Sequence, residues 1–191
     1  YLGFEKGRIL EPAAGVGHFF GLMPESISDN SSVSAVECDS ISVRILQQLY
    51  PEADVQASFL EDATFRNNSM DMVMTNVPFV DNPHRDSRYP KMYVHDYFFQ
   101  RNLYLLKPGG VMMAINSSRS MDSSRSLSSR ELMAEKADLI GGLRLPVNAF
   151  TKTAGAQVTT DILFLRKKDK SNFVGEKFTS LKEYENDLGD T

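Results

Sequence analysis

The chain carries ILEPAAGVGHF at residues 9–19, and this stretch predicts its fold. Residues 8–12 read as a short strand, followed by a turn at Gly15 and Gly17 and a short helix through Leu22. A strand, a glycine turn and a helix in succession are typical of a nucleotide-type site. The glycines let the backbone pass close to a ligand, and free backbone N–H groups lie at the start of the following helix. No lysine follows, as a phosphate loop requires, and Phe20 stands where a dinucleotide motif has its third glycine. Glu11 favours a ligand with a positive centre.

Apolar runs and helical patterns alternate along the rest of the chain. Further strands are predicted over residues 32–37, 54–59, 70–75, 110–116, 139–145 and 160–165, and longer helices over 41–49, 93–106 and about 128–137. This alternation predicts an α/β fold, a mostly parallel seven-stranded sheet with helices on both faces. A loop joins the last two strands, so one of them is expected to run antiparallel. Residues 169–191 are predicted to be a polar tail or linker, with one short helix over 181–187.

Composition narrows the class of protein. Of the 191 residues, 41% are hydrophobic and 24% charged, which indicates a globular domain and excludes a disordered or fibrous chain. No apolar run is long enough to span a membrane. The single cysteine excludes a disulfide framework and suits a cytoplasmic location, and three scattered histidines do not predict a metal site. Because the chain begins at Tyr1, it is expected to be a piece of something longer.

Charge is unevenly distributed along the chain. Residues 1–79 carry 4 basic and 11 acidic side chains, whereas residues 80–152 carry 11 basic and 7 acidic ones. The net charge of −4 makes the whole chain a poor candidate for tight non-specific binding to nucleic acid. The basic middle segment can still face a polyanion. Its loop 82–91, with Arg85, Arg88 and Lys91, reads equally as a phosphate contact and as a solvated loop.

Glu37 is a second candidate site residue, 20 residues after Gly17 and at the end of the next predicted strand. An acid in this position can hold the two hydroxyls of a ribose. Alone, Glu37 reads equally well as a solvated strand-end carboxylate. Together with the glycine turn, it favours the ligand-binding interpretation.

The stretch Asn76-Val77-Pro78-Phe79 follows the predicted strand 70–75. The Asn76 side-chain oxygen and the carbonyl before Pro78 can accept hydrogen bonds from an exocyclic amine, and Phe79 can stack on the ring that carries it. Such stacking contributes about 1–3 kcal/mol per base, which offsets much of the cost of flipping a nucleotide out of a duplex. The alternative is an ordinary strand-to-loop turn with a buried phenylalanine.

These motifs, in this order, resemble those of amino-methyltransferases that use S-adenosylmethionine. The sequence is most similar to the adenine-specific DNA methyltransferases of restriction-modification systems, above all to the methylase domain of large methylase–helicase proteins of phages and mobile elements. The likeness runs from about Arg8 to Lys168 and includes the stretches 41–50, 94–99, 106–111, 145–150 and 158–165. It implies a Rossmann-like class I methyltransferase domain over residues 1–168, DNA as partner, and a helicase domain in the same full-length chain.

The resemblance implies S-adenosylmethionine as the cofactor and a binding set near the glycine turn. Glu11 and the turn 15–17 would hold the methionine end of the cofactor, and Glu37 would bind its ribose. Cys38, Ser58 and Phe59 would lie beside its adenine. The implied cofactor-binding residues are Glu11, Pro12, Ala13, Gly15, Gly17, Glu37, Cys38, Ser58 and Phe59.

The implied catalytic residues are Asn76, Val77, Pro78 and Phe79. By this resemblance, Asn76 and the Val77 carbonyl would orient the target amine. Phe79 and Phe150 would hold the flipped base between their rings. Val77 stands where the family's usual Asn-Pro-Pro-aromatic phrase has its first proline, and because the required acceptor is a backbone carbonyl, valine also provides it.

The other side chains that could take part in catalysis are expected to have structural roles. His95 and Asp96 are expected to serve helix packing or capping, and His84 lies in a stretch that reads as a polar loop. Cys38 is expected to be a small apolar filler and not a reactive thiol.

The sequence therefore predicts an enzyme that transfers a methyl group from S-adenosylmethionine to the N6 amine of a flipped adenine in DNA. Two alternatives stay open at this point. The same chemistry serves methylation of cytosine N4 or of a protein glutamine. From another class, the chain could be a non-catalytic module that keeps the fold inside a larger helicase-bearing protein.

Overall fold

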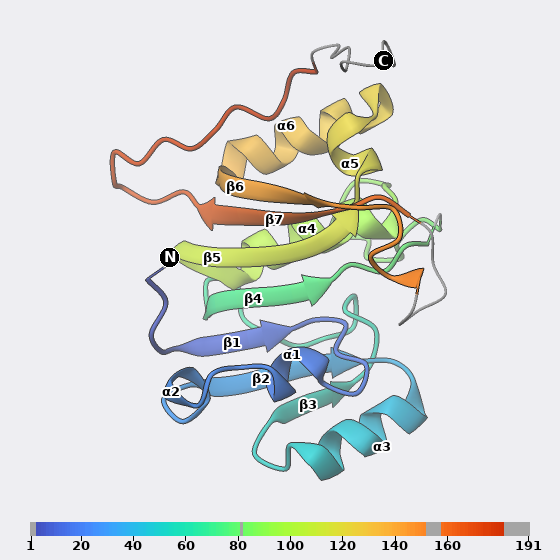
Figure 1. Ribbon diagram of the computed structural model, residues 1–191, viewed down its shortest axis with the longest axis vertical. Coiled ribbons are helices and arrows are strands. Elements are labelled where there is room, and N and C mark those ends of the chain that lie inside the picture. Colours follow the sequence, from blue (N-terminus) through green and yellow to red (C-terminus); the bar gives the residue numbers. More distant parts are fainter. Residues whose placement is uncertain (1–2, 81, 152–157, 182–191) are drawn as a thin grey trace.

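Seven strands form one sheet in the computed structural model, which describes residues 3–80, 82–151 and 158–181. In chain order the strands are β1 (Arg8–Glu11), β2 (Ser32–Glu37), β3 (Asp54–Ala57), β4 (Met70–Asn76), β5 (Leu106–Ser117), β6 (Ala137–Leu145) and β7 (Thr160–Lys167). They lie in the order β3-β2-β1-β4-β5-β7-β6 (Figure 1). Neighbours from β3 to β5 are parallel, and β7 is antiparallel to both β5 and β6. The predicted sheet, with one antiparallel strand, is confirmed.

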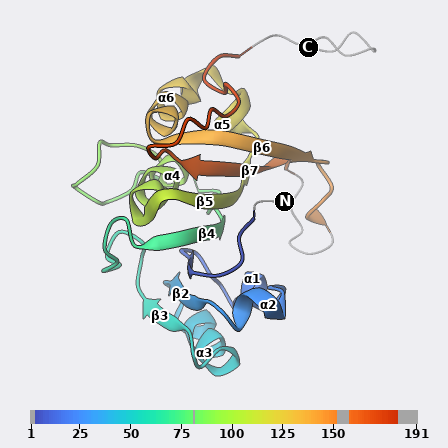
Figure 2. The ribbon, with the colours of Figure 1, turned by 90° about the vertical axis from the view of Figure 1, so that its left-hand side faces the viewer.

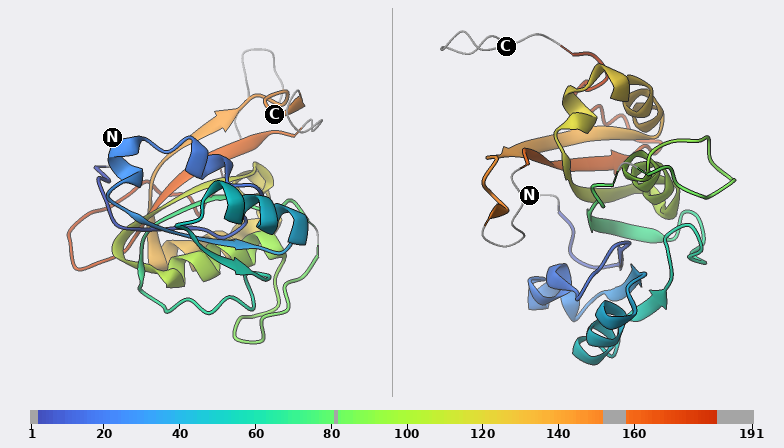
Figure 3. Two further views of the ribbon diagram at one scale, coloured as in Figure 1. Left: turned by 90° about the horizontal axis from the view of Figure 1, so that it is seen from below. Right: turned by 90° about the vertical axis from the view of Figure 1, so that its right-hand side faces the viewer.

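Helices cover both faces of this sheet. They are α1 (His18–Gly21), α2 (Glu25–Ser28), α3 (Ser40–Leu49), α4 (Val94–Leu105), α5 (Arg119–Asp122), the 3₁₀ turn η1 (Ser124–Ser126) and α6 (Leu127–Lys136). α1 and α2 lie on one side of the sheet, and α4 and α6 on the other (Figures 2 and 3). The sequence did not predict the short elements α2, α5 and η1, which are too brief to show an apolar period.

Each face of the sheet has its own apolar core. The smaller core joins Phe20 of α1 and Leu46 of α3 to Ala35 of β2. The larger core joins the sheet to α4, where Phe99 and Leu103 are fully buried. β2 is thus packed from both sides, because Ala35 belongs to the smaller core and Val36 to the larger one.

Several strand boundaries differ from the sequence prediction, and two of these differences have a local structural cause. β3 ends at Ala57, because the Ser58 N–H donates to the Gln56 carbonyl at 3.0 Å and turns the chain. β5 begins at Leu106, before the Pro108–Gly110 stretch expected to precede the strand. Its pairing with β4 jumps there, and Gly109 adopts a φ of 81°, so an irregular stretch is accommodated inside the strand.

The described part of the tail packs back onto the domain. The Glu176 N–H donates to the Leu139 carbonyl of β6 at 2.8 Å, and Phe178 is buried in the larger core. The stretch 169–181, expected as a polar tail or linker, therefore contributes to the core. The helix expected over 181–187 lies outside the described residues, apart from Leu181.

The sheet topology fixes where a ligand site belongs. From β1 the chain moves to β2 and β3 on one side, then returns to β4 and β5 on the other. In open α/β sheets, ligands bind outside the carboxyl ends of the strands at such a reversal.

Within the described ranges, no helix has the length and apolar character to cross a membrane.

Candidate active site

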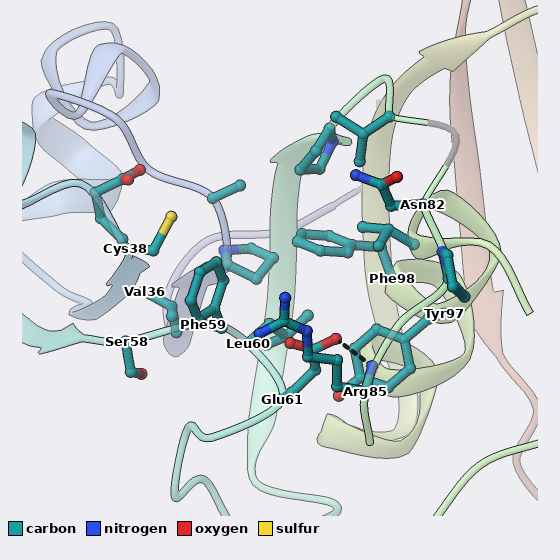
Figure 4. Close-up of a pocket in the computed structure, with 17 residues that line it drawn as sticks. Val36, Cys38, Ser58, Phe59, Leu60, Glu61, Asn82, Arg85, Tyr97 and Phe98 are labelled. Atoms are coloured by element: carbon teal, nitrogen blue, oxygen red, sulfur yellow. Dashed lines mark hydrogen bonds between the residues drawn. The ribbon is translucent and has the colours of Figure 1, made fainter. Parts of the chain in front are cut away.

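A pocket of about 420 Å³ lies at the carboxyl ends of β1 to β4, where the strand order reverses (Figure 4). Many of the residues that line this pocket directly follow a strand. The lining residues are Pro12, Ala13, Val36, Glu37, Cys38, Ser58, Phe59, Leu60, Glu61, Pro78, Val80, Asn82, Pro83, Arg85, Val94, Tyr97 and Phe98. The fold thus brings together six of the nine predicted cofactor-binding residues and Pro78 of the predicted catalytic set. The predicted cofactor-binding and catalytic residues that do not line this pocket are Glu11, Gly15, Gly17, Asn76, Val77 and Phe79.

The glycine turn is tied to the end of β2. The Glu37 carboxylate accepts hydrogen bonds from the backbone N–H groups of Gly15 and Asp39, each at 2.7 Å. Gly17 has a φ of 86°, and a Cβ there would lie 2.6 Å from Leu46 Cδ1. Glycine is therefore required at this position, both by backbone conformation and by the close approach of α3.

Glu11 lies at the end of β1 and is 2% exposed. Its Oε2 has no hydrogen-bond partner. Burial, and after it the negative charge of Glu37, raise the pKa of Glu11 to about 8. An unpartnered buried carboxyl is costly, so this position favours a ligand that supplies a donor or a positive charge.

The wall that follows β2 and β3 is partly open. Cys38 is exposed and lines the pocket, so the expectation that it is a filler is wrong: it lies beyond the strand end, where no core surrounds it. Partial loss of solvent at the pocket wall, and after it the negative charge of Glu37, raise the pKa of its thiol. Ser58 Oγ is buried without a partner, and the Phe59 ring is 55% exposed beside it. A flat ligand would find an aromatic face and an unpaired hydroxyl here.

The stretch after β4 combines an anchored backbone with exposed side chains. The Val77 N–H donates to the Ile115 carbonyl at 2.9 Å, and the Val77 side chain is 1% exposed. On either side of it, Asn76 is exposed and Phe79 is 46% exposed. The alternative of a turn with a buried phenylalanine is therefore wrong, and Asn76 and Phe79 are accessible to a substrate.

Phe150 lies apart from this arrangement as far as the structure describes it. It is half-buried in the segment that follows β6 and does not line the pocket. No ring contact between Phe79 and Phe150 occurs among the described residues. Stacking of a base between the two rings stays a prediction.

The loop 82–92 and the start of α4 form a further wall of the pocket. The sequence predicted the stretch 82–91 as a phosphate contact or a solvated loop, and did not predict that it lines the pocket. Figure 4 shows Tyr97 and Phe98 facing the pocket from α4, and the Arg85 N–H donates to the Glu61 carboxylate at 2.7 Å. Two aromatic residues in succession at a helix start beside a candidate motif are the signal that could have found this wall.

The loop is held to α4 by a buried polar cluster. His84 is 9% exposed and stacks on Tyr97, with ring centroids 4.6 Å apart. The Tyr97 hydroxyl donates to Asp86 at 2.9 Å, and Arg88 pairs with the same carboxylate. His84 lies in a polar loop, as expected, but these contacts bury its side chain against α4.

His95 and Asp96 serve packing, as predicted. Asp96 is 8% exposed and accepts a hydrogen bond from the Ser129 hydroxyl at 2.7 Å, which joins α4 to α6. His95 Nε2 lies 3.6 Å from the same carboxylate. In the described parts of the chain, no three His, Cys, Asp or Glu side chains gather as metal ligands would.

Comparison with solved structures identifies the fold. A Listeria monocytogenes protein assigned to the class I S-adenosylmethionine-dependent methyltransferases superposes with a TM-score of 0.75 over 95% of this chain and 61% of its own, at 16% identity. The methyltransferase subunit of a type I restriction-modification system from Streptococcus thermophilus gives 0.74 over 88% and 42%, also at 16% identity. The chain therefore has the Rossmann-like class I methyltransferase fold, as predicted.

Comparison with curated sequences gives one relative of higher identity. The chain is 33% identical over 175 residues to "Defense against restriction protein B" of Escherichia phage P1. The match covers 86% of this chain and 7% of that protein, so the chain corresponds to a small part of the relative's length. No protein-family model matches the chain.

Proposed function

We propose that residues 1–168 form a catalytic domain that transfers a methyl group from S-adenosylmethionine to the N6 amine of an adenine flipped out of DNA. The observation that carries the proposal is that residues from the carboxyl ends of four neighbouring strands line one pocket, among them Ala13 after β1, Glu37 at the end of β2 and Pro78 after β4. The likeness to a restriction-modification methyltransferase subunit supports DNA as the partner.

The pocket fits the proposed cofactor. Glu37 would hold the ribose hydroxyls at the end of β2, and Phe59 would lie along the adenine beside the unpaired Ser58 hydroxyl. The buried Glu11 carboxyl, whose Oε2 has no partner, would face the methionine end with its positive amino group. When bound, S-adenosylmethionine supplies a methyl group on a positively charged sulfur.

Asn76 and Val77 would prepare the target amine. The nitrogen lone pair of an exocyclic amine is delocalised into its ring, which makes the amine a poor nucleophile. Two acceptors, the Asn76 side-chain oxygen and the Val77 carbonyl, would take hydrogen bonds from the two amine hydrogens and favour a pyramidal nitrogen. Because Val77 is buried and its N–H is bonded to β5, both acceptors sit on a rigid strand end, which is electrostatic preorganisation.

Phe79 would hold the target ring in place. Its side chain is 46% exposed, so the ring is open to stacking. Stacking on one aromatic ring contributes about 1–3 kcal/mol, comparable with the cost of flipping a base. Phe150 is proposed as a second ring on the opposite side of the base.

The alternatives differ from this proposal in substrate or in activity. Cytosine N4 and a protein glutamine present the same planar amine or amide to Asn76, and a non-catalytic module would bind without turnover. Neither the two solved structures nor the phage protein named above is described as a helicase, so a helicase domain in the same chain stays an expectation from the sequence.

The test is methyl transfer from isotopically labelled S-adenosylmethionine to duplex DNA, followed by nucleoside analysis. We expect label in N6-methyladenine, and its loss in Asn76→Ala with cofactor binding retained. Asn172→Ala, at an exposed asparagine that lines neither this pocket nor the cavity beside α4, serves as the matched control. Label in N4-methylcytosine or in protein would contradict the adenine assignment, and equal turnover of Asn76→Ala would contradict the assigned role of Asn76.

A further inference from the structure

A second cavity lies behind the loop 82–92 and shares no residue with the strand-end pocket. It has a volume of about 440 Å³ and lies between α4, the segment after β3 and the loop. Its lining residues are Phe65, Asn67, Arg88, Tyr89, Arg101 and Tyr104. Two are arginines and none is acidic, so the cavity is positively charged.

Arg101 is the unusual member of this cavity, because it is 3% exposed and has no carboxylate partner in the described chain. Its guanidinium donates to the Asn67 side-chain oxygen at 2.8 Å and to the Phe65 carbonyl at 3.3 Å, both neutral acceptors. Its Nε has no hydrogen-bond partner. A buried charge without a counter-ion is strongly unfavourable, so the position favours an anion from outside.

Arg88 adds a second guanidinium at the same cavity. Its Nε and Nη2 pair with Asp86, and Nη2 also donates to the Glu61 carbonyl at 3.0 Å. These bonds fix its orientation, and its Nη1 carries no hydrogen bond within the described residues. Asp86 thus neutralises and positions Arg88, whereas the charge of Arg101 is not balanced by a carboxylate within the described residues.

We propose that this cavity binds a phosphate group. Guanidinium groups bind phosphate oxygens through paired N–H donors. The aromatic walls of Phe65, Tyr89 and Tyr104 and the volume leave room for the sugar that a phosphate ester carries. The source is either free phosphate or the DNA backbone, and the chemistry of recognition is the same.

The site is connected to the strand-end pocket through the loop. Arg88 and Tyr89 line the second cavity, and Asn82, Pro83 and Arg85 line the first. A phosphate held by Arg88 and Arg101 would therefore fasten the loop to α4. The inference rests on the charge and burial of this cavity and does not depend on methyl transfer.

The test is titration of the wild-type protein with inorganic phosphate, followed by NMR of the arginine Nε–H and backbone amide signals. We expect saturable shifts at Arg101, Arg88 and Tyr89, and none with sodium chloride at equal ionic strength. Shifts absent from these residues, or equal with chloride, would overturn the proposal. A short DNA duplex is the second probe: if it moves the same signals and phosphate competes, the source is the DNA backbone, and if phosphate alone moves them, it is free phosphate.

Variants provide an independent measurement. Arg88→Gln is expected to weaken phosphate binding about tenfold or more, and Arg125→Gln, an exposed arginine elsewhere, is expected to leave it unchanged. Arg101→Lys is used in place of Arg101→Gln, which removes a buried side chain's charge and can prevent folding. Arg101→Lys keeps the charge but lacks the planar, paired N–H donors, so it is expected to bind phosphate more weakly than wild type. Wild-type affinity in folded Arg88→Gln and Arg101→Lys would overturn the proposal.

Discussion

The Glu37 carboxylate accepts a hydrogen bond of 2.7 Å from the backbone N–H of Gly15, and this bond joins the end of β2 to the turn after β1. A second bond, from the Asp39 N–H, fixes the other carboxylate oxygen at 2.7 Å. One side chain thus orients the glycine turn, the start of α3 and the rim of the pocket together. Changes to any of these should affect ligand binding and stability jointly.

The two glycines of the turn should differ in their tolerance of a side chain. A left-handed alanine costs about 1–2 kcal/mol at either position. At Gly17 the added Cβ also meets Leu46 and Tyr50 atoms at 2.6 Å, whereas at Gly15 nothing lies within 4 Å. Overpacking adds about 1–3 kcal/mol, so urea unfolding should show Gly17→Ala less stable than Gly15→Ala by that margin. Equal losses would contradict the close packing of α3 against the turn.

Glu11 should make stability fall as pH rises. Its pKa in the folded protein, about 8, lies above the ordinary glutamate pKa of 4.5, so between these values the folded state holds a proton that the unfolded state has lost. The penalty is absent below about pH 4.5 and fully present above about 8, on the order of a few kcal/mol. Urea unfolding of the ligand-free protein across this range should show the decline in wild type and a flatter profile in Glu11→Gln. If the free energy of unfolding of wild type and of Glu11→Gln depended on pH in the same way, the burial assigned to the Glu11 carboxyl would be contradicted.

The Tyr97 hydroxyl should anchor the loop 82–92. Tyr97→Phe keeps the ring that stacks on His84 and removes the donor to Asp86, an acceptor also paired with Arg88. A hydrogen bond to a charged group contributes about 1.5–3 kcal/mol. We expect Tyr97→Phe to lower the free energy of unfolding by about 1.5 kcal/mol, the lower end of this range, with faster amide hydrogen exchange at Arg88 and Tyr89. Tyr93→Phe, at a ring that is 53% exposed, is the control and should change neither.

Sequence reasoning predicted the fold because each long element carries its own period. The apolar positions of residues 41–49 and 93–106 mark α3 and α4, and the buried strands separate them. The packed tail was not predicted, because Phe178 is one apolar residue in a polar stretch and only its partners in the core reveal its role.

The site was predicted in part for the same physical reason. Residues that directly follow a strand, such as Glu37 and Pro78, reach the pocket by topology alone. The inward turn of the loop 82–92 depends on the contacts that Tyr97 makes with Asp86, 11 residues away in the sequence, and with His84. Contacts between residues this far apart leave no local pattern in the sequence.

The central claim is that the strand-end pocket holds S-adenosylmethionine through Glu37. Calorimetric titration of the wild-type protein with S-adenosylmethionine tests it most directly, with Glu37→Ala as the disabling variant and Glu135→Gln, an exposed acid on α6, as the control. We expect saturable binding of one cofactor per chain in wild type and control, and its loss in folded Glu37→Ala. Absence of binding in wild type, or equal binding in Glu37→Ala, would contradict it.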